Sequence, residues 1–415
     1  MKLAFSAGCF SPSRLNGALP LLALLAMAPP RALAQAQYSV TDLGTLGGSF
    51  SYAYGINTNA QIVGQAWNGG GDGRAFLYTG GTMLDLGSLG GAASWANAIN
   101  NNGQVAGGAY TAGNSAYHAC LSTGGPMTDL GTLGGPSSDA YALNNNGQVV
   151  GNASTTNNAA IRAFLYTGGI MSDLGTLGGT NSLALGINNV GQTVGQAQAS
   201  NGLWHAFLYT GGAMSDLGTL GGSSSWANAI NNSGQIVGAA YASNGLERAF
   251  LYIAGTMKNL GTLGGSMSWA NAINNSGQIV GGSNAGNEAE HAFLYTGGAM
   301  LDLNNLIPAN SGWTLENARA INDSGQIVGS GTDPSDQTHA FLLTPLPALT
   351  IQRLSNLILS WPAANSSAFA LYQNPDLGPS NWSPVTNTPV LTNGHYQVSI
   401  PGPLGARKFF RLLSH

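Results

Sequence analysis

The chain has 415 residues, of which 7% are charged, and its formal net charge is -4. This composition gives no basic footprint for nucleic acid and no polybasic patch for a membrane surface. Its 62 glycines recur at fixed positions between apolar segments, which indicates turns in a folded array rather than disorder.

Residues 1–34 have the features of an export signal. A long, positively charged region precedes the apolar run 18–28, and Ala32-Leu-Ala34 is a small-residue cleavage site. A membrane anchor is the alternative, but the run is shorter than the ~20 apolar residues that a bilayer needs, and Pro20 interrupts it. We therefore expect an exported protein, extracellular, surface-attached or periplasmic, with no transmembrane segment after residue 34.

A repeat of 43 or 44 residues fills most of the remaining chain. Its clearest marker is a pair of residues, Asp-Leu or once Asn-Leu, before Gly in most copies. The first member of this pair is Asp42, Asp85, Asp129, Asp173, Asp216, Asn259 and Asp302. A repeat of this period is typical of propellers and solenoids.

Each copy predicts four short strands, called a to d below. In one copy these are residues 226–230, 235–239, 248–252 and 256–260, which are short and rich in β-branched and aromatic residues. Asn-Asn-Ser-Gly joins strands a and b, and its Gly suits the left-handed position of a hairpin turn. The first copy has Ala60 there, so either Asn59 takes the positive φ or the turn is of another type.

Four strands per copy indicate the blades of a β-propeller. The array begins with a lone strand d at residues 38–43 and ends with a strand c at 339–343. These two fragments complete one blade if the ring closes. We therefore predict an all-β, seven-bladed propeller over residues 35–345, closed by its N-terminal strand. An open array or solenoid gives no reason for complementary ends.

Strand c begins with His or Arg in every copy, and in the first six copies the Asp or Asn of strand d follows eleven residues later. We predict that Arg74 lies opposite Asp85 and Phe76 opposite Met83, so that these polar residues fix the hairpin register. An anion-binding or metal-binding ring is the alternative, but Arg cannot ligate a metal. The predicted structural pairs are Arg74/Asp85, His118/Asp129, Arg162/Asp173, His205/Asp216, Arg248/Asn259, His291/Asp302 and His339/Asp42.

The loops between strands b and c differ from copy to copy, as recognition loops on a regular scaffold do. Relaxed surface loops with no partner are the alternative. The candidate ligand-binding residues are Trp67, Asp72, Tyr110, Tyr117, Trp204, Tyr241, Glu288, Glu290, Asp333 and Asp336, and Glu247 lies in the same loop as Tyr241.

The first position of strand a also varies between copies, and it holds Trp95, Trp226 and Trp269 among others. We interpret these aromatic residues as packing between blades. An aromatic lining of the channel mouth is the alternative.

The seventh copy replaces the uniform d–a loop with residues 304–312. Asp323, Asp333 and Asp336 lie in this copy, but their spacing matches no calcium-loop pattern. We therefore predict neither a metal site nor a cofactor.

Residues 346–415 form a second region after Pro345-Leu-Pro347. Its short apolar segments, separated by Pro, Gly and Asn, predict a small β-sandwich-like domain. The pattern of Leu359-Ser-Trp-Pro362, Trp382, Gly394 and Phe409-Phe-Arg-Leu412 resembles small C-terminal β modules of exported bacterial proteins.

The repeat motifs His-Ala-Phe-Leu-Tyr, Asp-Leu-Gly-Thr-Leu-Gly-Gly and Ile-Asn-Asn-x-Gly-Gln-Ile-Val-Gly resemble those of the HAF family of extracellular repeat proteins. The resemblance covers about residues 38–343. This chain departs from the family at Cys120, at Asn259, in the three copies with Arg and in the altered seventh copy. It implies export and repeats, but no activity and no functional residue.

Three functions are compatible with this sequence. The first is a secreted scaffold for binding or adhesion, whose partner is an extracellular glycan or surface polymer. The second is a polysaccharide lyase or hydrolase built on a propeller, although we find no nucleophile elbow, His-Glu-x-x-His motif or paired carboxylates, and no catalytic residue is predicted. The third is a structural component of the extracellular matrix.

Overall fold

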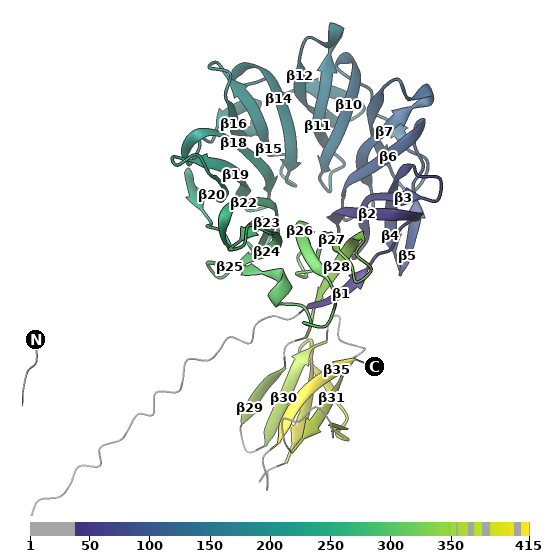
Figure 1. Ribbon diagram of the computed structural model, residues 1–415, viewed down its shortest axis with the longest axis vertical. Helices are drawn as coiled ribbons and strands as arrows, with labels where there is room; N and C mark the ends of the chain where they lie inside the picture. Colours follow the sequence, from purple (N-terminus) through teal and green to yellow (C-terminus); the bar gives the residue numbers. More distant parts are fainter. Residues whose placement is uncertain are drawn as a thin grey trace, which may run out of the picture. The chain divides into compact units, whose positions relative to one another are not determined.

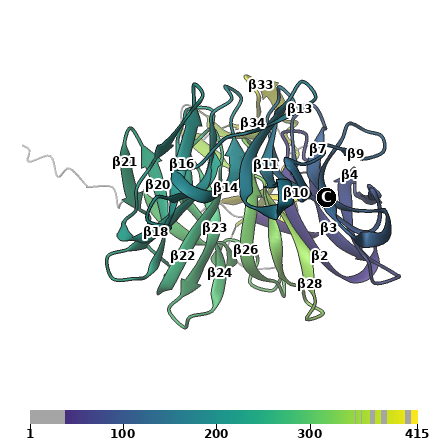
Figure 2. The same cartoon turned by 90° about the horizontal axis from the view of Figure 1, so that it is seen from above.

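The computed structural model describes residues 38–347, 349–353, 356–363, 369–375, 382–401 and 408–414. It confirms an all-β propeller of seven four-stranded blades (Figure 1; seen from above in Figure 2). The proposed export signal, residues 1–34, lies outside the described residues. In the described part of the chain, no helix combines the length and the apolar character needed to cross a bilayer.

The strands of the first four blades are given from strand a to strand d. Blade 1 contains β2 (Gly47–Ile56), β3 (Ile62–Asn68), β4 (Gly73–Thr79) and β5 (Thr82–Asp85). Blade 2 contains β6 (Gly90–Ile99), β7 (Val105–Thr111), β8 (Tyr117–Ser122) and β9 (Thr128–Asp129), with a short 3-10 helix η1 (Ala112–Asn114). Blade 3 contains β10 (Gly134–Leu143), β11 (Val149–Thr155), β12 (Ile161–Thr167) and β13 (Ile170–Asp173), with η2 (Thr156–Asn158). Blade 4 contains β14 (Gly178–Ile187), β15 (Thr193–Ala199), β16 (Trp204–Thr210) and β17 (Ala213–Asp216).

The remaining blades repeat this order until the ring closes. Blade 5 contains β18 (Gly221–Ile230), β19 (Ile236–Ala242), β20 (Glu247–Ile253) and β21 (Thr256–Asn259). Blade 6 contains β22 (Gly264–Ile273), β23 (Ile279–Ala285), β24 (Glu290–Thr296) and β25 (Ala299–Asp302), followed by η3 (Leu303–Asn305). Blade 7 contains β26 (Thr314–Ile321), β27 (Ile327–Thr332), β28 (Thr338–Pro345) and β1 (Tyr38–Asp42).

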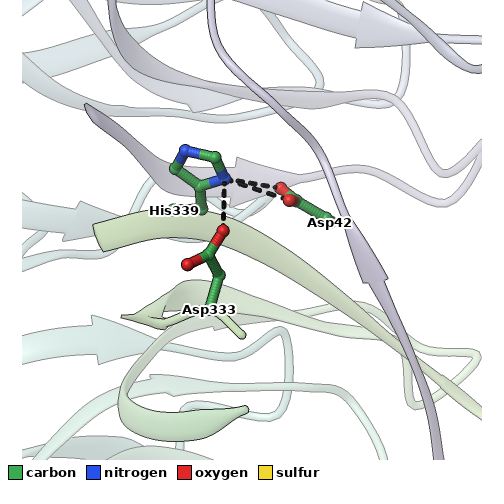
Figure 3. Close-up of side chains that lie close together, drawn as sticks. All are labelled: Asp42, Asp333 and His339. Carbon is green, nitrogen blue, oxygen red and sulfur yellow. Dashed lines mark hydrogen bonds and ion pairs between the residues drawn. The ribbon is translucent and has the colours of Figure 1, made fainter. Parts of the chain in front are cut away.

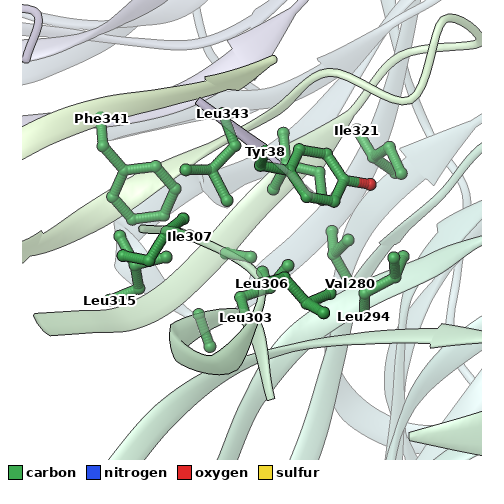
Figure 4. Close-up of a cluster of buried hydrophobic side chains, with 13 residues drawn as sticks. Tyr38, Val280, Leu294, Leu303, Leu306, Ile307, Leu315, Ile321, Phe341 and Leu343 are labelled. Carbon is green, nitrogen blue, oxygen red and sulfur yellow. The ribbon is translucent and has the colours of Figure 1, made fainter. Parts of the chain in front are cut away.

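Closure of the ring joins the two ends of the array. Strand β1 pairs antiparallel with β28 from Tyr38↔Pro345 to Asp42↔Phe341. In Figure 1 the purple β1 lies beside the green β28. Tyr38 is buried in a cluster that includes Leu303, Leu306 and Leu343 (Figure 4). The N-terminal strand therefore supplies both backbone pairing and core to blade 7.

The blades pack against one another through strand c. Six blades bury a phenylalanine there with no exposed surface, and the second blade buries Cys120 in its place. The facing strand b has glycine in all seven blades. At Gly64 an added Cβ would lie 1.9 Å from the Tyr52 carbonyl oxygen, and at Gly329 it would lie 1.9 Å from that of Asn317. Only glycine allows strands a and b to approach this closely.

The inner strand is longer than predicted. In blade 5 the sequence predicted a start at residue 226, but β18 begins at Gly221. The Gly-Gly pair that we assigned to the d–a loop is part of this strand, and Leu220 forms an isolated bridge to Ala242. The prediction was wrong because glycine was interpreted as a loop residue.

The predicted register of the c–d hairpin was also wrong. Thr79 pairs with Thr82 and Phe76 pairs with Asp85, so Arg74 lies two residues beyond the position opposite Asp85. The cause is a two-residue turn in which Gly80 and Gly81 both have positive φ, as a type I′ turn requires.

The a–b turn of blade 1 follows neither predicted alternative. Ala60 itself has a φ of 57° and donates its N–H to the Asn57 carbonyl. Gly103 makes the equivalent bond to Asn100 in blade 2. The a–b turn of blade 1 therefore has the same geometry as that of blade 2, with Ala60 held in the left-handed region.

The C-terminal strands form two sheets. One sheet has the order β29 (Thr350–Arg353), β30 (Leu357–Pro362), β34 (His395–Ile400), β33 (Val390–Thr392), and the other has the order β32 (Ser383–Pro384), β31 (Phe369–Asn374), β35 (Phe409–Ser414). Leu359 and Trp361 from the first sheet and Leu371 from the second share one buried core. Strand β33 was not predicted.

Candidate functional site

A β-bulge interrupts the inner strand of every blade. In blade 1 Ala53 pairs with Gly64 and Gly55 pairs with Val63, which leaves Tyr54 as the extra residue. A bulge of this kind re-aims one side chain and is frequent near functional sites. The bulge residues around the ring are Tyr54, Asn97, Tyr141, Leu185, Asn228, Asn271 and Arg319.

These seven residues line a cavity of about 620 Å³ in the channel, which we call the channel cavity. Three further residues complete its wall: Trp226, Trp269 and Glu247. The wall therefore combines four aromatic side chains and one leucine with three amides, one carboxylate and one guanidinium. A concave surface of aromatic groups with a few placed polar groups is typical of ligand sites.

The amide side chains of the channel cavity are held by the neighbouring blade. Asn97 donates from Nδ2 to the Ala140 carbonyl at 2.8 Å. Asn228 makes the same bond to Ala270 at 2.8 Å, and Asn271 makes it to Ala318 at 2.9 Å. Among residues 38–347 no donor reaches the Oδ1 atom of these three residues. Fixed amides with a spare acceptor are suited to hydrogen bonding with a ligand hydroxyl.

Arg319 is the single cationic residue of the cavity wall. In the described part of the chain no carboxylate lies within ion-pair distance of its guanidinium, although its charge acts to lower the pKa of both Tyr54 and Glu290. Burial is the larger influence at both groups, so both pKa values are raised. Burial also raises the pKa of Glu247. Burial therefore acts against the charged forms of Tyr54 and Glu247, which line the cavity, and of Glu290, which does not.

Asp139 occupies the inter-blade position beside the channel cavity. Its carboxylate is 8% exposed and accepts from Trp95 Nε1 at 3.0 and 3.2 Å. Burial raises the pKa of Asp139 to about 7, and the hydrogen bond from Trp95 offsets part of this effect. Gly108 makes the space, because an added Cβ there would lie 2.5 Å from the Trp95 ring.

A regular ring of polar residues surrounds the other end of the channel. Two residues after the bulge, one isoleucine or leucine from each blade lines a smaller cavity of about 240 Å³ at the a–b turns. In each turn one asparagine donates from Nδ2 to the corresponding carbonyl of the next blade. This ring, which we call the asparagine ring, consists of Asn57, Asn100, Asn144, Asn188, Asn231, Asn274 and Asn322. The bond from Asn322 back to Asn57, 3.0 Å long, completes it.

Several candidate ligand-binding residues contact other side chains of their own blade. Trp67 lies edge-on to Phe50 and Tyr52, with ring centroids 6.1 and 6.0 Å apart. Tyr110 and Tyr117 face each other at 5.9 Å. In the fifth blade Tyr241 lies 5.8 Å from Trp226. Trp204 begins β16, and Asp72 lies in the exposed turn before β4.

The other four acidic candidates come from two loops. Glu288 has a φ of 62° and accepts from the backbone N–H and the Oγ of Ser266, which lower its pKa. Glu290 accepts from Asn317 Nδ2 at 3.0 Å. Asp333 and Asp336 share the β27–β28 turn. Asp323, which we had considered with them, lies in the a–b turn and accepts from Asn275 instead.

None of the ten candidates lines the channel cavity, and Glu247 is the loop residue that does. That the ten bind a ligand stays a prediction. The strand a aromatics divide between the two interpretations: Trp95 packs between blades, while Trp226 and Trp269 line the cavity. Variation of the bulge residue, from Tyr to Asn, Leu and Arg in an otherwise regular strand, was the signal that could have found the cavity.

The two side chains of a predicted structural pair lie in polar contact in five of the seven cases. The pairs and their distances are Arg74–Asp85 3.3 Å, His118–Asp129 2.7 Å, His205–Asp216 2.7 Å, His291–Asp302 2.7 Å and His339–Asp42 3.0 Å. No such contact joins Arg162 to Asp173 or Arg248 to Asn259 in the described part of the chain. Arg248 donates instead to the Glu247 and Ser266 carbonyls.

The acidic member of each pair also caps the turn that follows it. Asp85 Oδ1 accepts from the Gly87 N–H at 2.7 Å, and Asn259 accepts from the Gly261 N–H at 2.8 Å. Since an amide oxygen serves equally in this bond, asparagine is tolerated at position 259. The equivalent residues of the other five copies make the same bond.

No protein-family model matches the chain, and no curated protein sequence does. Among solved structures it is similar to a puromycin-hydrolyzing peptidase of Mycobacterium tuberculosis, with a TM-score of 0.49 and 10% identity over 80% of this chain and 62% of the peptidase. It thus spans less than two thirds of the peptidase. The WD40 β-propeller domain of Doa1 gives a TM-score of 0.42 and 11% identity over 73% of this chain and 96% of that one. A mutant Aleuria aurantia lectin in complex with Fucα1-6GlcNAc gives a TM-score of 0.33 and 12% identity over 90% of this chain and 98% of the lectin. These likenesses concern the propeller fold alone.

Proposed function

We propose that this chain is an exported binding or adhesion scaffold that takes up a glycan in the channel cavity. The observation that carries the proposal is the lining of that cavity. Trp226, Trp269, Tyr54 and Tyr141 offer flat apolar faces of the kind that pack against the C–H face of a sugar ring. The amides of Asn97, Asn228 and Asn271 would bond its hydroxyl groups.

Two features of the sequence support an extracellular role. The export signal in residues 1–34 would deliver the chain to the cell surface, the medium or the periplasm. The resemblance of the repeats to the HAF family agrees with such a location. We infer a HAF-like repeat protein whose variable b–c loops surround the mouth of the cavity.

One observation favours hydrolysis as a second candidate function. Glu247 lies in the cavity wall, and burial raises its pKa, as in a general acid. However, glycoside hydrolysis ordinarily needs two carboxyl groups about the scissile bond. Glu247 is the single carboxylate among the ten residues of the wall. Binding without turnover is therefore the better supported function.

A glycan array with the purified chain tests the proposal. Two sets of variants distinguish the cavity from the loops: Trp269→Ala and Asn228→Ala in the cavity, and Trp67→Ala and Trp204→Ala in the loops. We expect a selective glycan signal that the cavity variants lose and the loop variants retain. Asn232→Ala, at the opposite end of the channel, is the matched control for Asn228→Ala and should leave binding unchanged.

The other outcomes separate the alternatives. Loss in the loop variants alone would refute the channel cavity and favour the loop residues. Release of shorter saccharides from the bound glycan, abolished by Glu247→Gln, would favour the hydrolase. The absence of any glycan signal from the folded wild-type chain would refute glycan binding and favour a matrix role.

A further inference from the structure

The seam of the ring brings together three potential metal ligands. Asp42 ends β1, His339 lies in β28, and Asp333 lies in the turn before β28 (Figure 3). His339 Nδ1 lies 3.1 and 3.0 Å from the two carboxylate oxygens of Asp42 and 3.5 Å from Asp333 Oδ2. One ligand atom from each residue lies within 4.8 Å of the others.

This arrangement differs from the equivalent pairs in other blades. In His118, His205 and His291 the Nδ1 atom contacts one carboxylate oxygen at 2.7 Å, as in an ordinary hydrogen bond. At the seam the contact to Asp42 is longer and shared between both oxygens. A second carboxylate, that of Asp333, is present only here among the His-bearing pairs of the described chain.

The turn that holds Asp333 does not require a carboxylate. Asp333 Oδ1 accepts from the N–H groups of Ser335 and Gln337, both at 2.8 Å. In blade 1 Asn68 holds the same position and makes the same two bonds with its amide oxygen, at 2.9 and 3.0 Å. Neutral asparagine therefore suffices for the turn, and the negative charge at position 333 needs another reason.

The second oxygen of Asp333 points to that reason. The side chain is 6% exposed, and within the described residues no hydrogen-bond donor other than the His339 ring at 3.5 Å faces its Oδ2. A carboxylate oxygen on a side chain that is only slightly exposed, with no closer donor, gains from a nearby cation. A cation between Oδ2, His339 and Asp42 would satisfy it, and the Asp42 side chain, 41% exposed, leaves a path for the ion.

We propose that Asp42, Asp333 and His339 bind a divalent cation of the Zn²⁺ class, which clasps the N-terminal strand to blade 7. Zinc takes one imidazole and two carboxylate ligands at about 2.0–2.2 Å, and such ligands lie about 3.4 Å apart in a tetrahedral site. The distances from His339 Nδ1 to the carboxylate oxygens of Asp42 and Asp333, 3.0 and 3.5 Å, agree with this spacing. Binding requires neutral His339, so any proton on Nδ1 is released to solvent, and water fills the fourth position.

Isothermal titration of the EDTA-treated full chain with ZnCl₂ tests the site. Asp333→Asn is the informative variant because Asn68 shows that asparagine supports this turn. His339→Gln removes the nitrogen ligand, and His205→Gln removes the equivalent histidine of blade 4 as a matched control. We expect one Zn²⁺ per wild-type or His205→Gln chain, an affinity reduced about tenfold or more by Asp333→Asn, and loss of this binding in His339→Gln.

Thermal unfolding gives an independent readout. At the same Zn²⁺ concentration, the Tm of the wild-type chain should rise by more than that of Asp333→Asn, because weaker binding gives less stabilisation. Equal zinc binding by the wild type and both seam variants, or no stoichiometric binding by the wild type, would overturn the proposal. Calcium is the comparison, because it prefers oxygen ligands. Tighter binding of Ca²⁺ than Zn²⁺, retained in His339→Gln, would also overturn it.

Discussion

Substitution of Tyr38 by alanine tests the closure of the ring at its end strand. Tyr38 is 2% exposed and packs with Leu303, Leu306 and Leu343, and its N–H donates to the Leu306 carbonyl at 2.8 Å. Replacing a buried aromatic residue by alanine removes its transfer free energy and leaves a cavity. The expected loss is about 3–5 kcal/mol in the free energy of unfolding.

A residue in the middle of the array provides the reference. Phe207 in β16 is fully buried, so Phe207→Ala should cost the same amount, about 3–5 kcal/mol. Equilibrium unfolding in urea measures both variants and the wild type. Tyr38→Phe is the control, since it keeps the buried ring and removes only the hydroxyl, whose pKa burial raises to about 12. We expect a loss of about 1 kcal/mol or less for this variant.

The comparison of Tyr38→Ala with Phe207→Ala tests whether β1 closes the ring. If β1 closes the ring, residues at the end and in the middle of the array are equally buried and the two losses are similar. A loss below about 1 kcal/mol for Tyr38→Ala, beside a full loss for Phe207→Ala, would show that β1 adds nothing to blade 7. That result would refute the closure argument.

Two further predictions concern single side chains. Ala60→Gly should raise the free energy of unfolding, measured in urea, by roughly 0.5–1 kcal/mol. The φ of 57° strains alanine, and this strain exceeds the extra conformational entropy that glycine loses on folding. An unchanged free energy of unfolding would contradict this account. Burial raises the pKa of Asp139 from 3.8 to about 7, so the folded state binds the carboxyl proton more tightly than the unfolded state does. The free energy of unfolding of the wild type should therefore fall as the pH rises from about 4 to about 7, by ~4 kcal/mol at most. Asp139→Asn should lose this part of the pH dependence when urea unfolding is compared at about pH 5 and pH 8, and an identical dependence in both proteins would refute the assignment.

The overall architecture was accessible from the sequence because its signals are periodic. The spacing of 43 or 44 residues gave seven blades, and the unmatched strands at residues 38–43 and 339–343 gave the closure. These inferences need only the number and order of strands. They do not depend on where a single side chain points.

The channel cavity was not predicted, because it depends on a local irregularity. Simple alternation along strand a cannot anticipate the bulge that places Tyr54 or Arg319 in the channel wall. The c–d register failed for a related reason, since the turn at Gly80 and Gly81 is one of several that fit the sequence. At the seam, Asp42 and Asp333 are about 290 residues apart, and no short-range pattern connects them.

The asparagine ring has a consequence for engineering. Five of its links join residues 43 or 44 positions apart, whereas the link from Asn274 to Asn322 spans 48 positions, and its length is still 3.1 Å. The extra residues within 304–312 thus lie between strand d of blade 6 and strand a of blade 7. They leave the hydrogen bond from Asn274 to Asn322 unchanged. The same junction in the other blades should accept grafted peptide loops, which would make the ring a carrier for designed recognition sequences.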